Sequence, residues 1–221
     1  MRFTHKEELV PSIWQYFFVP ERPVDFIPGQ YTSFHMTRPL DDPRGQSRVF
    51  SFTSLPSDEH VSFVAKFVPP LSPYKQALQA LQPDDELWVE DAMGDLVLPK
   101  LTSVPLVFIA GGIGLASYIS MLRQLLTDRE ERQIFLFYAV RNQAEQIFTD
   151  VLGAYPLALK HITITPHRLT ADEIVGSVPP DTFYYLSGSQ RFVEGLQADF
   201  EQVGIPRERI VFDYFDGYTE L

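Results

Sequence analysis

The sequence contains no cysteine, so it has no disulfides, no thiolate ligands for an iron–sulfur cluster and no cysteine nucleophile. Histidine is also scarce, and no two of the five histidines have the spacing of a HExxH zinc motif. They are His5, His35, His60, His161 and His167. From these absences we expect no metal site, and a chemistry that does not depend on a protein-bound metal.

Basic residues are outnumbered, because 18 lysines and arginines stand against 29 acidic residues and give a formal net charge of −11. Such a chain lacks the basic surface that binds nucleic acid without sequence preference. No run approaches the roughly 18 apolar residues that span a membrane. The first residues carry no apolar segment of the kind found in secretory signals. We therefore expect a cytoplasmic protein with no nucleic-acid partner and no membrane span.

Residues 1–100 carry the pattern of an antiparallel β structure. In one segment Val61, Phe63 and Phe67 share a face by strict alternation, and clusters of proline or glycine separate the runs. The predicted strands are 12–19, 31–36, 48–54, 60–68 and 86–90, with one short helix at 73–81. This pattern predicts an N-terminal domain, residues 1–100, that is an antiparallel β-barrel.

Residues 101–221 instead alternate apolar strands with helices. The predicted strands are 105–110, 133–140, 161–165, 182–186 and 209–215, and the predicted helices are 115–126, 143–152 and 191–203. Strands separated by helices pair in parallel through right-handed crossovers. The sequence therefore predicts a second domain, residues 101–221, that is a Rossmann-like α/β domain.

A glycine-rich turn, Gly111-Gly112-Ile113-Gly114, follows the first strand of this second domain and opens its first helix. A helix N-terminus presents free amides and a partial positive charge, and glycine lets the backbone approach a phosphate closely. The turn is therefore a candidate phosphate-binding loop, although a tight turn without a ligand would look the same. It lacks the GxGxxG spacing of the standard dinucleotide fingerprint.

In the barrel, alternation places Arg48, Phe50 and Phe52 on one face of the strand predicted at 48–54, and Ser51 on the other. An arginine there could pair with a phosphate through two hydrogen bonds, and a phenylalanine could stack on a flat ring. The same residues would also suit an ordinary barrel strand that carries a surface arginine.

Several short motifs follow one another along almost the whole chain. They are FIPGQY at 26–31, RVFSFTS at 48–54, VAKF at 64–67, a serine at Ser72, a glycine-bearing turn at 91–95, GGIG at 111–114 and SGS at 187–189. In this order they resemble the ferredoxin–NADP reductase superfamily, which includes flavin reductases and the reductases of oxygenases. The resemblance implies a flavin-binding barrel followed by an α/β domain that binds a nicotinamide nucleotide.

For the flavin, the resemblance implies FAD ahead of FMN. It implies that Arg48 binds the flavin diphosphate, that Phe50 packs against the isoalloxazine, and that Ser51 hydrogen-bonds near its N5 atom. Ser72 would cap the diphosphate at the start of a helix. Tyr218, in the C-terminal tail, would cover the flavin.

For the electron donor, NAD(P)H, the resemblance implies that Gly111, Gly112 and Gly114 hold the diphosphate of the nucleotide. Ser187 and Gly188 would lie beside the nicotinamide. The family often has Cys-Gly-Pro where this sequence has Ser-Gly-Ser, and the serine keeps a small polar group at that place.

Three other residues are candidates for catalysis or specificity. Asp213 matches an acidic position in the last strand of the family, and with Ser51 it could handle a proton near the flavin. Arg141 and Arg168 follow two strands of the α/β domain and could meet the 2′-phosphate that distinguishes NADPH from NADH. Either arginine could equally belong to the surface.

Three functions remain open at this point. The first is an oxidoreductase that passes a hydride from NAD(P)H to bound FAD and electrons onward to a separate acceptor, either a protein or a small molecule. The second is a reductase that uses free flavin as its substrate. The third is a non-catalytic electron-relay subunit that keeps the fold without turnover.

Overall fold

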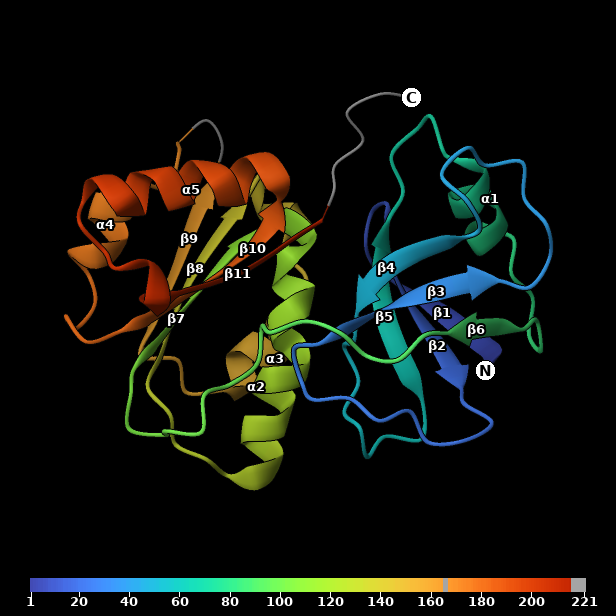
Figure 1. Ribbon diagram of the computed structural model, residues 1–221, viewed down its shortest axis with the longest axis horizontal. Coiled ribbons are helices and arrows are strands. Elements are labelled where there is room, and N and C mark those ends of the chain that lie inside the picture. The colour runs from blue at the N-terminus through green and yellow to red at the C-terminus, as the bar shows by residue number, and fades with distance from the viewer. Residues whose placement is uncertain (165–166, 216–221) are drawn as a thin grey trace.

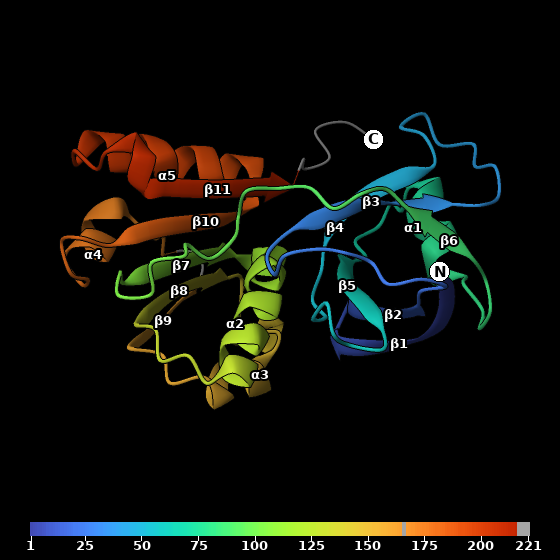
Figure 2. The same ribbon diagram turned by 60° about the horizontal axis from the view of Figure 1, so that its bottom comes forward.

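The computed structural model describes residues 1–164 and 167–215, which form two parts lying side by side (Figures 1 and 2). The N-terminal part contains two three-stranded antiparallel sheets with the orders β1-β2-β5 and β4-β3-β6. Its elements are β1 (Arg2–Val10), β2 (Ile13–Val19), β3 (Tyr31–Met36), β4 (Ser47–Ser51), β5 (Val61–Lys66), α1 (Pro73–Gln79) and β6 (Leu87–Val89).

The two sheets close into a barrel through contacts at their edges. An isolated bridge between Arg2 and Glu86 links β1 to the segment that enters β6. The amide of Thr53, just after β4, donates to the carbonyl of Ser62 on β5 at 2.8 Å. The antiparallel barrel predicted for the N-terminal residues is therefore confirmed.

The barrel encloses an aromatic core, because alternate residues of its strands point inward. Tyr16, Phe18, Phe34 and Phe63 are fully buried there. Phe50 of β4 stacks on Phe63 with the ring centroids 4.2 Å apart. Aromatic side chains of this kind contribute large buried areas, so the position of β4 is fixed by the core beneath it.

The C-terminal part is a five-stranded sheet with the order β11-β10-β7-β8-β9, and all four pairings are parallel. Its elements are β7 (Leu106–Gly111), η1 (Gly112–Leu115), α2 (Ala116–Asp128), β8 (Ile134–Val140), η2 (Gln143–Glu145), α3 (Thr149–Ala154), β9 (Leu159–Ile164), α4 (Ala171–Val175), β10 (Phe183–Ser189), α5 (Gln190–Gln202), η3 (Arg207–Arg209) and β11 (Ile210–Phe215). Helices α2 and α3 cover one face of the sheet, and α4 and α5 cover the other (Figure 1). The predicted Rossmann-like architecture is confirmed.

Helix α2 fixes the barrel against the sheet. Ile13, Val64 and Leu96 of the N-terminal part belong to the same buried cluster as the apolar face of α2. In the FIPGQY motif, the amide of Gly29 donates to the hydroxyl of Ser120 on α2 at 2.9 Å. Helix α2 therefore contacts both the sheet that it covers and the barrel.

Two predicted elements are wrong in extent. The helix predicted over 143–152 is two short elements, η2 and α3, because Phe148 between them has a left-handed backbone with φ of 53°. Burial of Ile147 and Phe148 in the core outweighs the helical pattern. The strand predicted over 48–54 ends at Ser51, beyond which the chain turns toward β5.

Strand β1 and helix α4 were not predicted, and neither was the short helix η3. In β1 the charged residues Lys6, Glu7 and Glu8 obscure the alternation of a strand. Helix α4 is only five residues long, and Thr170 and Glu173 form a capping box at its start. No helix in the described part of the chain combines the length and the apolar character of a membrane span.

Candidate functional site

A cavity of about 1400 Å³ lies between the barrel and the sheet. Strands β4 and β5 of the barrel contribute Arg48, Phe50 and Ser51 to one wall, together with Lys66. The opposite wall comes from the carboxyl ends of β7, β8 and β9, from the residues that follow β10, and from β11. Ligands of open α/β sheets bind at the carboxyl ends of the strands, so this cavity is the candidate site.

The cavity reaches the point where the strand order reverses. Strand β7 lies at the centre of the sheet, with β8 on one side and β10 on the other. The chain leaves β7 toward β8 and leaves β10 toward β11, so the two connections diverge and open a crevice between them. Gly111 and Gly112, at the end of β7, line the cavity at this point.

Three buried serine hydroxyls cross the boundary between the two parts. Ser51 of β4 lies 3.1 Å from Ser117 on the first turn of α2, measured between the Oγ atoms. The Oγ of Ser117 is also 3.1 Å from the Oγ of Ser187 on β10. All three side chains are almost fully buried. Either member of each pair can donate, so the three hydroxyls form a continuous hydrogen-bonded chain from the barrel to the sheet.

We expect the Ser117→Ala variant to lose about 1–2 kcal/mol in the free energy of unfolding, because both neighbouring hydroxyls lose a buried partner. Urea denaturation of the purified protein measures this loss. Ser103, which is exposed, provides the control substitution Ser103→Ala. Equal stability of the two variants would contradict the serine chain.

The four glycines of the candidate site have different surroundings. Gly112 has a left-handed backbone with φ of 55°, and a Cβ atom placed on it would meet nothing within 4 Å. Gly114 faces the backbone of β10, where its Cβ would lie 2.4 Å from the Ser187 carbonyl oxygen. Gly111 and Gly188 face the ring of Phe192. Gly112 is therefore open to the cavity, whereas Gly114 allows close packing between η1 and β10.

Asp213 of β11 lies in the cavity wall beside Ser187, its register partner on β10. Burial raises the pKa of its carboxyl to about 6, although a backbone hydrogen bond from Tyr214 acts in the opposite direction. Its Oδ2 atom is buried and has no hydrogen-bond partner. The side chain therefore changes charge in the range where many enzymes take up and release protons.

The Asp213→Asn variant should be more stable than the parent at pH 8, by about 1–3 kcal/mol, and equally stable near pH 4. The unfolded chain releases this proton near 3.8, whereas the folded protein keeps it to about 6. Stability therefore falls as the pH rises through this window, and asparagine removes the loss. Melting temperatures across pH 4–8 measure the effect, with the exposed Asp25→Asn as control. A gain that does not vary with pH would contradict the assignment.

Unsatisfied polar atoms gather at this cavity. In the described part of the chain, four buried side-chain polar atoms lack a hydrogen-bond partner. Three of them belong to cavity residues, namely Arg48 Nε, Thr163 Oγ1 and Asp213 Oδ2. Native proteins satisfy nearly all buried polar groups, so a concentration of unpaired donors and acceptors around one cavity is the pattern of a ligand site.

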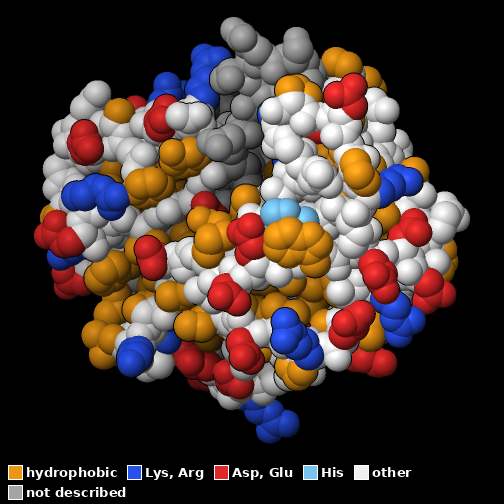
Figure 3. Space-filling view, turned by 45° about the vertical axis from the view of Figure 1, so that its right-hand side comes forward, with side chains coloured by type: hydrophobic (Ala, Val, Ile, Leu, Met, Phe, Trp, Pro, Cys, Tyr) orange, Lys and Arg blue, Asp and Glu red, His pale blue; other side chains and the backbone are white. Residues whose placement is uncertain are grey.

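The charge of the cavity is opposite to that of the chain. Two carboxylates line it, from Glu145 and Asp213, against five basic side chains. The basic side chains are Arg44, Arg48, Lys66, Lys75 and Arg141. In contrast, acidic side chains are spread over both parts of the face drawn in Figure 3. In a protein with a net charge of −11, such a lining favours an anionic ligand.

The remaining predicted site residues lie farther from the cavity or outside the described chain. Ser72 is buried, and its hydroxyl accepts a hydrogen bond from the Lys75 amide as the N-cap of α1. Arg168 pairs with Asp199 at 3.0 Å. Tyr218 lies outside the described residues.

Two residues of the site escaped the sequence analysis. Ser117 connects Ser51 to Ser187, and no sequence pattern relates these three positions. Asp42 forms an ion pair with Arg48 and lies in an Asp-Pro-Arg-Gly segment. That segment predicts a turn, but nothing in it identifies Arg48 as the partner of the carboxylate.

Residues 108–178 match the family model described as the oxidoreductase NAD-binding domain. Flavohemoprotein A of Dictyostelium discoideum is 24% identical to this chain and aligns with 98% of it. The ferredoxin–NAD(P)(+) reductase component of a naphthalene 1,2-dioxygenase system, from Pseudomonas putida, is 25% identical over 88% of the chain. The alignments span only 60% and 62% of these two relatives.

Solved structures share the whole fold. The flavohem-like FAD/NAD binding domain of nitric oxide dioxygenase from Vibrio cholerae superposes with a TM-score of 0.80 at 16% identity, over 98% of both chains. The ferredoxin–NADP+ reductase of Plasmodium falciparum gives a TM-score of 0.80 at 16% identity, over 97% of this chain and 95% of its own. These likenesses show that the chain has the fold of the ferredoxin–NADP reductase superfamily.

Proposed function

We propose that this chain is an NAD(P)H-dependent flavin oxidoreductase, in which residues 1–100 bind FAD and residues 101–221 bind the nicotinamide nucleotide. The observation that carries the proposal is the cavity between the two parts, lined by unpaired polar atoms and by an excess of basic side chains. Both ligands contain a diphosphate and a flat ring. A basic cavity with an aromatic wall suits both features.

On the barrel side, the fit rests on residues of β4. Arg48 carries a buried Nε with no partner and would contribute to binding the FAD diphosphate. Phe50 is half-buried beside the cavity and is held on Phe63, so it offers a fixed apolar surface to the isoalloxazine. Ser51 would hydrogen-bond to the flavin ring, with Ser117 keeping its hydroxyl in place. Ser72 acts on this side only indirectly, by capping α1.

On the sheet side, Gly111 and Gly112 line the cavity and would accept the diphosphate of the nicotinamide nucleotide. Gly112 is the more open of the two, because a Cβ atom on it would meet nothing within 4 Å. Arg141, at the end of β8, also lines the cavity and would contact the adenosine end. Gly188 and Gly114 serve the packing around this loop. They permit the close approach of β7, η1 and β10 that shapes the site.

When bound, the nicotinamide supplies a hydride and the flavin accepts it and passes electrons onward. The protein's part is to place the two rings in contact and to manage the associated proton. Asp213 is suited to hold that proton, because its pKa of about 6 lies close to neutrality. A hydrogen-bonded chain of hydroxyls, from Ser51, Ser117 and Ser187, also lies at this site. These hydroxyls keep the site polar without adding a charged group.

The acceptor of the electrons is proposed to be a separate protein or small molecule. The Pseudomonas putida relative is named as the reductase component of a dioxygenase system, which supports electron transfer to another component. No cysteine is present in these 221 residues, so they contain no thiolate-bound cluster that could receive the electrons.

A second candidate function is the reduction of exchangeable flavin. The ion pair between Arg48 and Asp42 favours it, because an arginine that is already paired holds a diphosphate less firmly. The third possibility, an electron-relay subunit without turnover, predicts flavin binding but no reduction by a nicotinamide.

Anaerobic titration tests the proposal directly. The purified protein is loaded with FAD and then titrated with NADH and, separately, with NADPH, while flavin absorbance is followed. We expect bleaching of the bound flavin by at least one nicotinamide. Binding of FAD without bleaching by either would support the relay instead. Failure to bind any flavin would contradict the proposed function.

We expect the Gly112→Val variant to keep its affinity for flavin but to show a KM for NAD(P)H raised by at least about tenfold, since the side chain would enter the space of the diphosphate. Part of any effect could come from strain, because φ is 55°. Gly204 has φ of 78° and open surroundings at the end of α5. Gly204→Val therefore carries similar strain away from the cavity and should leave KM unchanged.

A further inference from the structure

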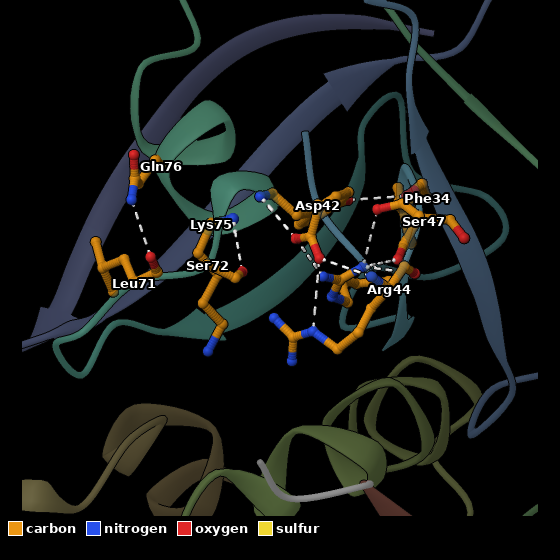
Figure 4. Close-up of polar contacts among 11 residues, drawn as sticks. Phe34, Asp42, Arg44, Ser47, Leu71, Ser72, Lys75 and Gln76 are labelled. Atoms are coloured by element: carbon orange, nitrogen blue, oxygen red, sulfur yellow. Dashed lines mark hydrogen bonds and ion pairs between the residues drawn. The ribbon is translucent and has the colours of Figure 1, made fainter. Parts of the chain in front are cut away.

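An internal carboxylate lies against the arginine that the proposed function assigns to the flavin diphosphate. Asp42, in the loop between β3 and β4, has a fully buried side chain. Its Oδ2 accepts a hydrogen bond from Arg48 Nη2 at 2.5 Å and another from the Tyr74 amide at 3.1 Å. Figure 4 shows Asp42 in this network between the loop and the start of α1. The carboxylate therefore makes charge-assisted contacts of the kind that a phosphate oxygen would make.

Short-range bonds keep Asp42 in this position. Its Oδ1 accepts from the Arg44 amide at 3.0 Å, and its carbonyl accepts from the Gly45 amide at 2.9 Å. Burial alone would raise the pKa of Asp42, but the amides of Arg44 and Tyr74 and the charge of Arg48 outweigh it and lower the pKa. The turn thus delivers an ionised carboxylate to Arg48 at neutral pH.

Other contacts use most of the remaining donors of Arg48. Its Nη1 donates to the carbonyls of Ser47 at 2.5 Å and Gly45 at 3.3 Å, and its guanidinium lies 5.0 Å from the ring centroid of Tyr74. Nε alone is buried without a partner. An incoming phosphate can therefore reach a bidentate pairing with Arg48 only by displacing Asp42 or by sharing the guanidinium with it.

We propose that Asp42 is an internal anion that competes with the flavin diphosphate for Arg48, and that it thereby reduces the preference of this barrel for FAD over riboflavin. The inference rests on the proposed flavin site. Riboflavin has no phosphate, so Asp42 does not compete with it. Phe50 and Ser51, which would contact the isoalloxazine, come after Arg48 on β4, whereas Asp42 comes before it. The chain would consequently bind FAD less tightly than the basic side chains that line the cavity suggest.

The test compares flavins that share the isoalloxazine and differ in phosphate. Dissociation constants of FAD, FMN and riboflavin are measured by flavin fluorescence for the full chain and for the Asp42→Asn and Asp42→Ser variants. We expect both variants to bind FAD about tenfold or more tightly than the parent, and riboflavin within about twofold. The Asp41→Asn variant makes the same charge change on the exposed neighbour and should bind all three flavins as the parent does.

The opposite result has a clear meaning. If Asp42 only positions Arg48 for the diphosphate, both variants will bind FAD more weakly, and that outcome overturns the proposal. Tighter binding of riboflavin and FAD by the same factor would also overturn it, because competition for Arg48 cannot affect a flavin that lacks phosphate. A failure of the proposed function is seen separately, as the absence of binding of FAD, FMN and riboflavin by the parent chain, and would remove the inference with it. Melting temperatures of both variants without flavin show whether they are folded.

Discussion

Replacement of Arg48 by alanine is expected to lower the free energy of unfolding by about 3 kcal/mol, because it leaves the buried carboxylate of Asp42 without its main counter-charge. The side chain of Asp42 is fully buried, and Arg48 is its closest cation. The guanidinium of Arg44 lies 3.6 Å away and can compensate only in part. The same variant should lose about tenfold in FAD affinity through the missing phosphate contact, with little change for riboflavin.

Two further variants isolate the cause. Arg38, on the same loop, is exposed, so Arg38→Ala should change neither stability nor FAD affinity. The double variant Arg48→Ala with Asp42→Asn removes the uncompensated charge, and we expect it to recover a large part of the stability lost by Arg48→Ala alone. Chemical denaturation gives these free energies, and fluorescence gives the flavin affinities. An Arg48→Ala protein with unchanged stability would show that the ion pair contributes nothing.

The order of the elements could be predicted from the sequence because the signals are local. Alternation in the strand at β5, the glycine turn after β7 and the Pro-Gly turn at Pro28 each report on a few neighbouring residues. Such signals were sufficient for the barrel and the parallel sheet. They failed at Phe148, where burial of the side chain in the core, a tertiary effect, breaks a segment with helical periodicity.

The candidate site was predictable only where one residue carries the chemistry by itself. Arg48, Phe50 and Gly112 were recognised on their own strands or turns, and they line the cavity. The partners of these residues were not predictable. Ser117 meets Ser51 only because α2 packs against the barrel, and Asp42 meets Arg48 only because of the path of the intervening loop.

These long-range contacts also explain why the glycine loop has two roles. The sequence presents Gly111, Gly112 and Gly114 as one phosphate-binding motif. In the structure only the first two line the cavity, whereas Gly114 lies against β10. A residue can thus belong to a binding motif and act through packing, by setting how closely the helix that follows approaches the neighbouring strand.

The Gly114→Ala variant is therefore expected to lose stability rather than nucleotide affinity alone. A Cβ atom at this position would lie 2.4 Å from the carbonyl oxygen of Ser187, 2.5 Å from its carbonyl carbon and 2.7 Å from the nitrogen of Gly188. These are backbone atoms of β10, which is hydrogen-bonded to β7 and β11 on its two sides and cannot give way. We expect a loss of about 3 kcal/mol from overpacking, which corresponds to a fall in Tm of roughly 6–12 °C for a protein of this size.

A shift of η1 and α2 in the Gly114→Ala variant should also be visible in the candidate site. If η1 and α2 move away from β10 to accommodate the methyl group, the 3.1 Å contact between Ser117 and Ser187 opens. A subsequent Ser117→Ala substitution should then cost less in the Gly114→Ala background than in the parent. Gly153, in α3, has nothing within 4 Å of an added Cβ, so Gly153→Ala is the control and should be neutral or stabilising by about 0.5–1 kcal/mol. Thermal unfolding of the parent, the three single variants Ser117→Ala, Gly114→Ala and Gly153→Ala, and the Gly114→Ala/Ser117→Ala double variant measures all of these effects. Equal Tm values for Gly114→Ala and Gly153→Ala would contradict the packing role of Gly114.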